Sequence, residues 1–192
     1  WENEDIVTLI TRPRRFGKTL NMDMLRCFFS NEYKDRGELF EGLNIWEDEK
    51  YRKIQGAYPV IFLSFAGIKG NIFELSRKQI SDRIIDLYES NRFLLKSDCI
   101  SDTEKARYIS FLENPMDEDI SFKLNELSNY LSRYYKKKVI ILLDEYDTPM
   151  QEAYVNGYWE ELVAFTRSLF NSTFKTNPYL ERAIMTGITR VS

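Results

Sequence analysis

The stretch Thr8–Leu20, TLITRPRRFGKTL, joins an apolar run to a helical pattern through a short basic turn. The apolar run, residues 6–10, is β-branched and nearly continuous in apolarity, which is typical of a strand buried on both faces of a parallel sheet. After the turn, apolar side chains recur at helical spacing, so we expect a helix over residues 18–29. The stretch therefore predicts a strand, a tight turn and a helix in direct succession.

The end of this turn has the residue types that bind phosphate. Backbone N–H groups at a helix N-terminus point at phosphate oxygens, the lysine of a G-K-[ST] sequence reaches the β- and γ-phosphates, and the next hydroxyl ligates Mg²⁺. Gly17-Lys18-Thr19 supplies these groups between a strand and an amphipathic helix, which is the context that the motif requires. The residues that we predict to bind a nucleotide are Arg14, Arg15, Phe16, Gly17, Lys18, Thr19 and Leu20.

Arg12 departs from this phosphate-binding motif. The pattern G-x-x-x-x-G-K-[ST] has a glycine there, which eases a tight turn and a close approach of the backbone to the phosphates. Either the Arg12 side chain reduces nucleotide affinity or it points outward, and the sequence leaves both open. A third interpretation is that Arg12, Arg14 and Arg15 form a solvated loop end or contact nucleic acid.

A second motif follows the strongest strand pattern of the chain, Val139–Leu143, which ends in Asp144-Glu145. In hydrolases with such a loop, a carboxylate at the end of a neighbouring apolar strand holds Mg²⁺, and a following glutamate activates the attacking water. We therefore predict Thr19 and Asp144 as metal ligands and Glu145 as a catalytic residue. The alternative is that the two acids only cap a loop. Asp147 is a secondary candidate, either for a metal, for an arginine partner or as a helix cap.

The last strand pattern, Ala183–Thr186, ends in a hydroxyl residue. In many ATPases a polar residue at such a strand end contacts the γ-phosphate or its water, so Thr186 is a catalytic candidate. Arg190, four residues on, is a candidate for stabilising charge during phosphoryl transfer, with a plain surface residue as the alternative. Lys18, Glu145, Thr186 and Arg190 make up the predicted catalytic set.

The order of the patterns predicts the architecture. Residues 58–65 read as a further buried strand, and helical patterns separate the four strands along the chain. Strands that alternate with helices indicate a parallel sheet with right-handed crossovers. We expect one α/β domain over residues 1–192, with a mostly parallel sheet of about four or five strands flanked by at least five helices.

Composition excludes several classes of function. The chain has no histidine, so Ser-His-Asp and Cys-His catalysis and imidazole metal sites are excluded within it. The net charge of −3 does not mark a nucleic-acid binder, and no apolar run approaches the roughly 20 residues of a membrane span. Cys27 and Cys99 match no metal spacing and read as reduced thiols of a cytoplasmic protein. Because the chain begins at Trp1 and stops at Ser192, just after a strand pattern, we read it as a fragment of a longer protein.

Four segments together resemble a known family. They are ITRPRRFGKTL (10–20), YPVIFLSF (58–65), VIILLDEYDTPM (139–150) and RAIMTGITRVS (182–192). They look like the AAA-ATPase-like domain of a large group of bacterial proteins, in which this domain typically precedes a PD-(D/E)XK nuclease-like domain. The family pattern also has an arginine at the position of Arg12.

The resemblance implies a three-layer P-loop NTPase fold of the ASCE type, with the strand before the loop next to the strand that carries Thr186. It implies ATP as the nucleotide, a Walker A motif at Arg12–Thr19, a Walker B motif at Val139–Glu145 and a sensor-like role for Thr186. Two family parts are absent from the sequence. Asp48-Glu49-Lys50 lies outside any strand pattern and is a poor match to a nuclease signature, and no C-terminal helical lid follows.

The expected function is that of an ATP-binding, Mg²⁺-dependent and ATP-hydrolysing module in the cytoplasm. Its expected partners are the nucleotide, the nuclease-like domain and, through that domain, nucleic acid, but no membrane. Two alternatives stay open. One is a P-loop scaffold that does not hydrolyse ATP and holds a partner domain. The other is a nucleic-acid-binding module, suggested by the loop arginines and by Lys136–Lys138, although the overall acidity counts against it.

Overall fold

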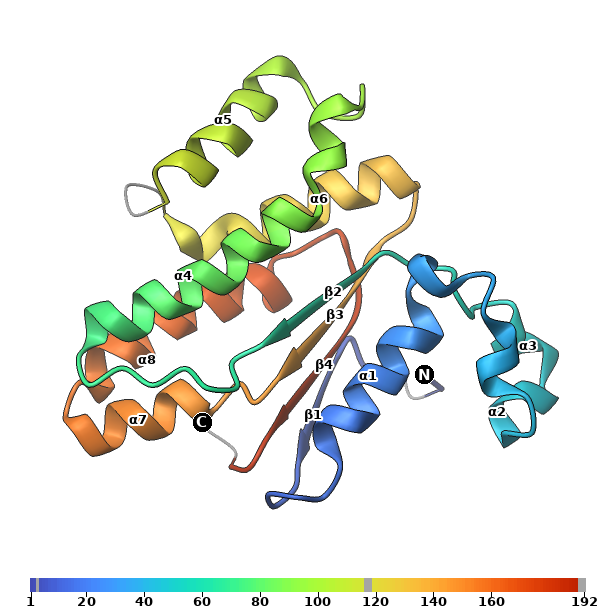
Figure 1. Ribbon diagram of the computed structural model, residues 1–192, viewed down its shortest axis with the longest axis horizontal. Coiled ribbons are helices and arrows are strands. Elements are labelled where there is room, and N and C mark those ends of the chain that lie inside the picture. The colour runs from blue at the N-terminus through green and yellow to red at the C-terminus, as the bar shows by residue number, and fades with distance from the viewer. Residues whose placement is uncertain (3, 116–118, 190–192) are drawn as a thin grey trace.

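Four parallel strands form the sheet in the computed structural model, which describes residues 1–2, 4–115 and 119–189. The strands are β1 (Val7–Thr11), β2 (Val60–Ser64), β3 (Val139–Asp144) and β4 (Leu180–Gly187). Their order across the sheet is β1-β4-β3-β2 (Figure 1). The prediction of an α/β domain with a parallel sheet is confirmed, and β1 lies beside β4, the strand that carries Thr186, as expected.

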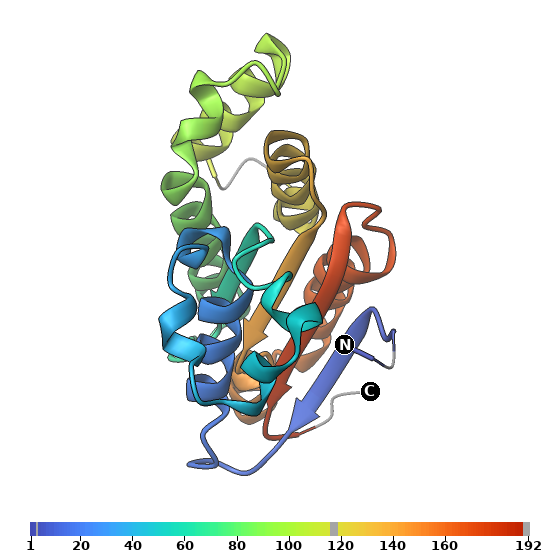
Figure 2. The ribbon, with the colours of Figure 1, turned by 90° about the vertical axis from the view of Figure 1, so that its right-hand side faces the viewer.

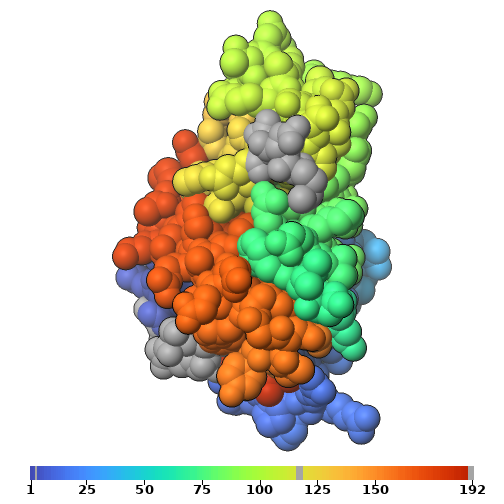
Figure 3. Space-filling model, turned by 90° about the vertical axis from the view of Figure 1, so that its left-hand side faces the viewer, coloured from blue at the N-terminus to red at the C-terminus, as the bar shows by residue number. Residues whose placement is uncertain are grey.

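Helices flank the sheet on both faces. One face is covered by α1 (Lys18–Phe29) and a segment that holds α2 (Asn44–Glu47) and α3 (Glu49–Arg52). The other is covered by α4 (Phe73–Ser90), α6 (Lys123–Tyr135) and α8 (Trp159–Phe170). On this side α5 (Asp102–Glu113) packs on α4, and α7 (Thr148–Asn156) packs on α8. In the space-filling view, α4 in green and the orange α7–α8 segment lie against each other (Figure 3).

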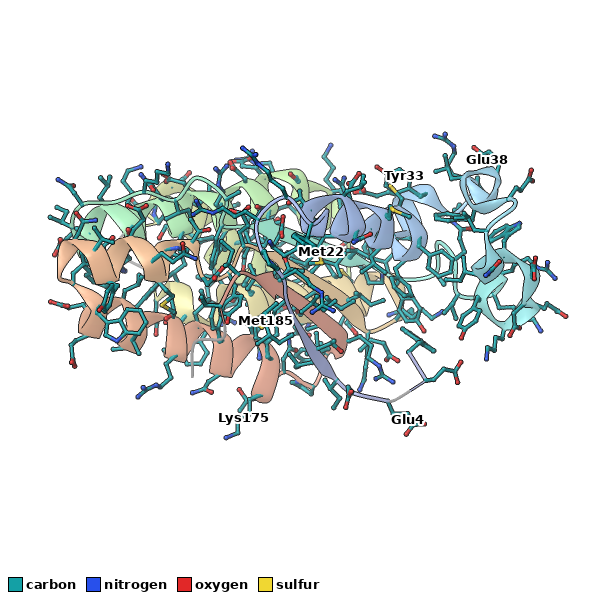
Figure 4. All side chains as sticks on the ribbon, turned by 90° about the horizontal axis from the view of Figure 1, so that it is seen from below. Glu4, Met22, Tyr33, Glu38, Lys175 and Met185 are labelled. Carbon is teal, nitrogen blue, oxygen red and sulfur yellow. The ribbon has the colours of Figure 1, made fainter. Side chains whose placement is uncertain are left out.

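Two apolar clusters fill the spaces between sheet and helices. Alternate residues of β3 point to opposite faces, so Ile140 and Leu142 join the cluster under α1, whereas Ile141 and Leu143 join the cluster under α4, α6 and α8. Figure 4 labels one methionine of each cluster, Met22 of α1 and Met185 of β4. The strand predicted here is confirmed as β3, and every one of its residues is buried.

The edge strands are less buried than we expected. Val7, Leu9 and Ile10 of β1 are 39%, 38% and 37% exposed, so the prediction of burial on both faces is wrong there. The reason is position. Within the described sheet β1 pairs only with β4, and neither apolar cluster contains a β1 residue (Figure 2). At the other edge, β2 buries Ile61 and Leu63 and leaves its alternate residues half-buried.

The first helix spans residues 18–29 as predicted. Helix α7 was not predicted from the sequence, although it carries the usual signals of helix ends. Pro149 stands in its first turn, and Gly157 ends it with a left-handed backbone, φ 82°. In the described part of the chain, no helix has both the length and the apolarity that crossing a membrane requires.

Candidate functional site

The loop between β1 and α1 turns sharply at two residues. Arg15 (φ 68°) and Gly17 (φ 72°) adopt left-handed backbone conformations, whereas Arg12 is not among the described residues with a positive φ. The Arg12 N–H donates to the carbonyl of Gly187 at 3.1 Å and so extends the pairing of β1 with β4. Its side chain is exposed, with Nη1 donating to the Thr11 carbonyl. Arg12 therefore has no conformational need for glycine, and its guanidinium is solvated.

The N-terminus of α1 presents its backbone donors to this loop. Gly17 is the residue before the helix, and no side chain of the described residues caps the first turn, which also contains no acid. The first N–H groups of a helix have no partner within the helix, and they form the positive end of its dipole. The arrangement suits an anion that approaches Lys18, Thr19 and Leu20 from the loop.

Lys18 lies back across its own loop. Its Nζ donates to the carbonyl oxygens of Arg12 and Pro13, both at 2.9 Å, and the side chain is half-buried. These two bonds hold the ammonium group beside the start of α1. Lys18 also lines both of two neighbouring cavities.

The larger cavity has a volume of about 400 Å³ and joins the loop to the ends of β3 and β4. Its lining residues are Arg14, Arg15, Gly17, Lys18, Thr19 and Leu20 of the loop and α1, together with Glu145, Thr148 and Ile188. The structure thus brings six of the seven predicted nucleotide-binding residues to one surface with Glu145. Three of the lining side chains are cationic and one is a carboxylate, so the cavity suits a polyanion.

The smaller cavity, of about 160 Å³, lies under α1 and contains the remaining predicted residues of the loop and of β4. Phe16, Lys18 and Thr186 line it together with Ile10, Arg12, Asn21, Met22 and Leu25. Thr186 comes close to the loop because Ile10 pairs with it in the register of β1 and β4. Lys18 therefore has a predicted catalytic candidate on each side, Glu145 in one cavity and Thr186 in the other.

Asp144 lies at the end of β3 and is fully buried. Its Oδ1 accepts hydrogen bonds from the Glu145 N–H at 3.1 Å and from the Thr186 hydroxyl, while its Oδ2 has no partner among the described residues. A buried carboxylate oxygen without a donor is costly unless a cation or a water reaches it. Asp144 lines neither cavity, and the side chain that donates to it is that of Thr186, which lines the smaller cavity.

Metal binding at this site would depend on few protein ligands. The described residues contain no group of three or more acidic or cysteine side chains that could hold an ion. The hydroxyl of Thr19 and the free Oδ2 of Asp144 are hard oxygen donors, which is the chemistry that Mg²⁺ prefers, and Mg²⁺ usually keeps several waters and substrate oxygens as its other ligands. The donor set therefore fits a nucleotide-bound Mg²⁺ and does not fit a metal site made by protein alone.

Glu145 has a strained backbone, with φ 52°. A left-handed conformation costs about 1–2 kcal/mol for a residue with a side chain, and such strain is common at functional sites. Its Oε2 accepts a hydrogen bond from the Thr148 hydroxyl at 3.1 Å, and both residues line the larger cavity. Sequence reasoning missed Thr148, although its place three residues after Glu145 was a usable signal. Arg190, the last predicted site residue, lies outside the described residues.

A protein-family model described as predicted AAA-ATPase matches residues 2–192 of this chain. The chain belongs to the predicted AAA-ATPase family. Membership supports ATP binding by this AAA-ATPase-like domain, and the parallel α/β sheet flanked by helices is consistent with it.

A curated relative of this AAA-ATPase-like domain comes from Azotobacter chroococcum mcd 1. It is described as an uncharacterized protein in the vnfD 5′ region and is 25% identical over 185 residues, which are 95% of this chain. The chain spans 30% of the length of this relative. No solved structure matches the chain.

Proposed function

We propose that the domain binds Mg-ATP and hydrolyses it. The observation that supports this most strongly is the larger cavity, where the loop before α1 and the end of β3, far apart in the sequence, face the same space. Parallel sheets bind ligands outside the carboxyl ends of their strands, and both segments lie at that end. Family membership supports ATP over other nucleotides.

In this proposal the loop binds the triphosphate. The N–H groups at the start of α1, with Arg14 and Arg15, contact the phosphate oxygens, and Phe16 and Leu20 border them. Lys18 neutralises charge on the β- and γ-phosphates. Without nucleotide, its ammonium stays on the carbonyls of Arg12 and Pro13, and phosphate oxygens replace these carbonyls on binding. The basic group is thus already held next to the place where it acts.

Thr19 and Asp144 are the residues that would hold Mg²⁺, and the free Oδ2 of Asp144 supports this assignment. When bound, the ion supplies charge neutralisation to the phosphoryl group that is transferred. Glu145 accepts the proton of the attacking water, and the Thr148 hydroxyl on its Oε2 orients the carboxylate. Thr186 donates to Asp144 and orients it toward the phosphates. Arg190 completes the proposed catalytic set as a charge-stabilising residue.

The test compares binding with turnover. We expect Lys18→Ala to weaken Mg-ATP binding at least tenfold by isothermal titration calorimetry, because it removes the cation that meets the phosphates. Lys78→Ala is the matched control, since Lys78 lies on α4, pairs with Asp82 at 2.8 Å and lines neither cavity. Negligible binding by the wild type and Lys18→Ala alike, in the full-length protein as well, would refute the proposal.

Hydrolysis is tested separately with Glu145→Gln. We expect this variant to keep its affinity for Mg-ATP and to lose turnover by about 10²-fold or more, because the amide cannot accept the proton of the water. A wild-type protein that binds Mg-ATP without any release of phosphate would instead support the scaffold alternative.

A further inference from the structure

Asp147 directly precedes α7 and is 1% exposed, yet it neither caps that helix with its side chain nor lines either cavity. Its Oδ2 accepts hydrogen bonds from the N–H groups of Ile188 and Thr189 and from the Thr189 hydroxyl, each at 2.9 Å. A fourth donor, Nε2 of Gln151, lies at 3.1 Å. Three of these four donors therefore belong to the segment that follows β4, and one belongs to α7.

Gly187 shows how closely the two segments approach. A Cβ atom at this position would lie 2.7 Å from Oδ1 of Asp147 and 2.7 Å from the Tyr146 ring, so a larger residue would push the segments apart. Tyr146 adds two contacts of its own. Its N–H donates to the Thr186 carbonyl at 3.0 Å, and its hydroxyl donates to the Thr189 carbonyl at 2.8 Å. Residues 186–189 are therefore held along their length by the turn 145–148.

The two segments that Asp147 joins are also two walls of the proposed site. The turn carries Glu145 and Thr148, which line the larger cavity, and the segment after β4 carries Ile188, which lines the same cavity. Thr186, at the start of that segment, contacts Asp144. The distance between the turn and this segment therefore depends on the bonds at Oδ2 of Asp147 together with the two hydrogen bonds of Tyr146.

We infer that Asp147 is a positioning residue, which clamps residues 186–189 to the turn 145–148 and so sets Glu145 and Thr186 against the nucleotide. The inference rests on the proposed function. The role assigned to Asp147 acts through Oδ2, which already accepts four hydrogen bonds, and makes no use of Oδ1, which is buried without a partner among the described residues. Reacting groups must be held to within a fraction of an ångström, whereas phosphate binding at the loop does not involve the clamp. Loss of the clamp therefore lowers the rate of hydrolysis and leaves nucleotide affinity nearly unchanged.

The first measurement tests the hydrogen bonds between Asp147 and residues 188–189 in the absence of nucleotide. Hydrogen exchange of the Ile188 and Thr189 amides is followed in the full chain for the wild type, Asp147→Asn and Thr189→Val. We expect exchange at both amides to accelerate at least tenfold in Asp147→Asn, because a neutral amide oxygen is a weaker acceptor. Unchanged exchange at these amides would overturn the clamp itself, whatever the domain does with ATP.

The second measurement tests the positioning role of Asp147 by determining kcat and the Kd for Mg-ATP. We expect Asp147→Asn to lower kcat about 10–100-fold with less than a threefold change in Kd. Thr189→Val should lower kcat by a smaller factor. Thr189→Ser, which keeps the hydroxyl, should have the wild-type kcat. Gln151→Ala is the matched control, since it removes a bond to the same oxygen from α7 and not from residues 186–189.

The outcomes separate the two claims. Accelerated exchange with unchanged kcat, or an equal loss of kcat in Gln151→Ala, would overturn the positioning role. If the wild type does not hydrolyse ATP, the proposed function fails and the positioning role fails with it, while the exchange data still establish or reject the clamp. Should Asp147→Asn not fold, Thr189→Val carries both measurements.

Discussion

Left-handed backbone conformations at single residues surround the larger cavity. Arg15, Gly17 and Glu145 line it, and each has a positive φ. For the two residues with side chains the cost is about 1–2 kcal/mol each, and the surrounding structure must supply that energy. Lys136, with φ 55°, has the same conformation at the C-terminal end of α6, but it lines neither cavity. The strain at Lys136 lies at a helix end, so a substitution there can relieve it without changing a residue of the candidate site.

We predict that Lys136→Gly stabilises the domain by about 0.5–1 kcal/mol. Glycine adopts the left-handed conformation at a helix end without the penalty of a side chain, and this gain exceeds its larger entropy in the unfolded chain. Urea unfolding measures the effect. Lys138→Gly is the control, because Lys138 is not among the described residues with positive φ, and it should give no gain. An unfolding midpoint for Lys136→Gly at or below that of the wild type would contradict the explanation.

The start of α5 shows how one side chain joins two elements. Ser101 and Glu104 form a reciprocal capping box, in which each side chain accepts from the backbone N–H of the other. Oε2 of Glu104 also accepts from Arg133 of α6 at 2.7 Å. The hydrogen bond from Arg133 lowers the pKa of Glu104 to about 2. The charged form of Glu104 therefore stabilises the packing of α5 on α6.

This lowered pKa predicts how stability depends on pH. Because the folded pKa of Glu104 lies below its ordinary value of 4.5, its contribution is complete above about pH 4.5 and is lost as the pH falls toward 2. Glu104→Gln should lower the free energy of unfolding by roughly 1 kcal/mol at pH 7, a value reduced for the partial solvation of Arg133, and by progressively less toward pH 2.

The measurement is urea unfolding of wild type and Glu104→Gln at several pH values from 7 to 2. Asp102→Asn is the control, because Asp102 stands in the same first turn and makes no ion pair with a described residue. If the difference in the free energy of unfolding between wild type and Glu104→Gln stayed constant across this pH range, the ion pair with Arg133 would not be the cause of that difference.

Across the whole molecule, β3 connects the two apolar clusters. Leu142 belongs to the cluster under α1, and Leu143 belongs to the cluster on the opposite face. Because β3 is buried on both faces, unfolding of one cluster would also disrupt the packing of the other. We therefore expect the sheet and its two helical layers to unfold as one unit. The nuclease-like domain stays a prediction from the resemblance.

We predict that Leu142→Ala costs about 2–5 kcal/mol, because it opens a cavity in a fully buried strand. Leu9→Ala is the matched control on β1, where the side chain is 38% exposed, and it should cost about 1 kcal/mol or less. Tryptophan fluorescence and circular dichroism should report the same unfolding transition in both variants. Two separate transitions would show that the layers unfold independently.

Local patterns predicted much of the fold. The helix over residues 18–29 and the buried strand β3 follow from the spacing of apolar side chains. Burial at the edge of the sheet could not be predicted in this way, because exposure depends on which neighbours a strand acquires. The apolar residues of β1 look like those of β3, yet β1 pairs on one side only within the described sheet.

For the candidate site, the residue types and their spacing predicted the loop, Asp144-Glu145 and Thr186 as site residues, because the binding of phosphate and Mg²⁺ uses such groups at strand ends. The pairing of β1 with β4 and of β4 with β3 brought them together, and no local pattern contains that information. The same pairing turned Asp147 toward Ile188 and Thr189 and buried Asp144 under Thr186. Contacts between residues so distant in the chain arise only when the sheet assembles.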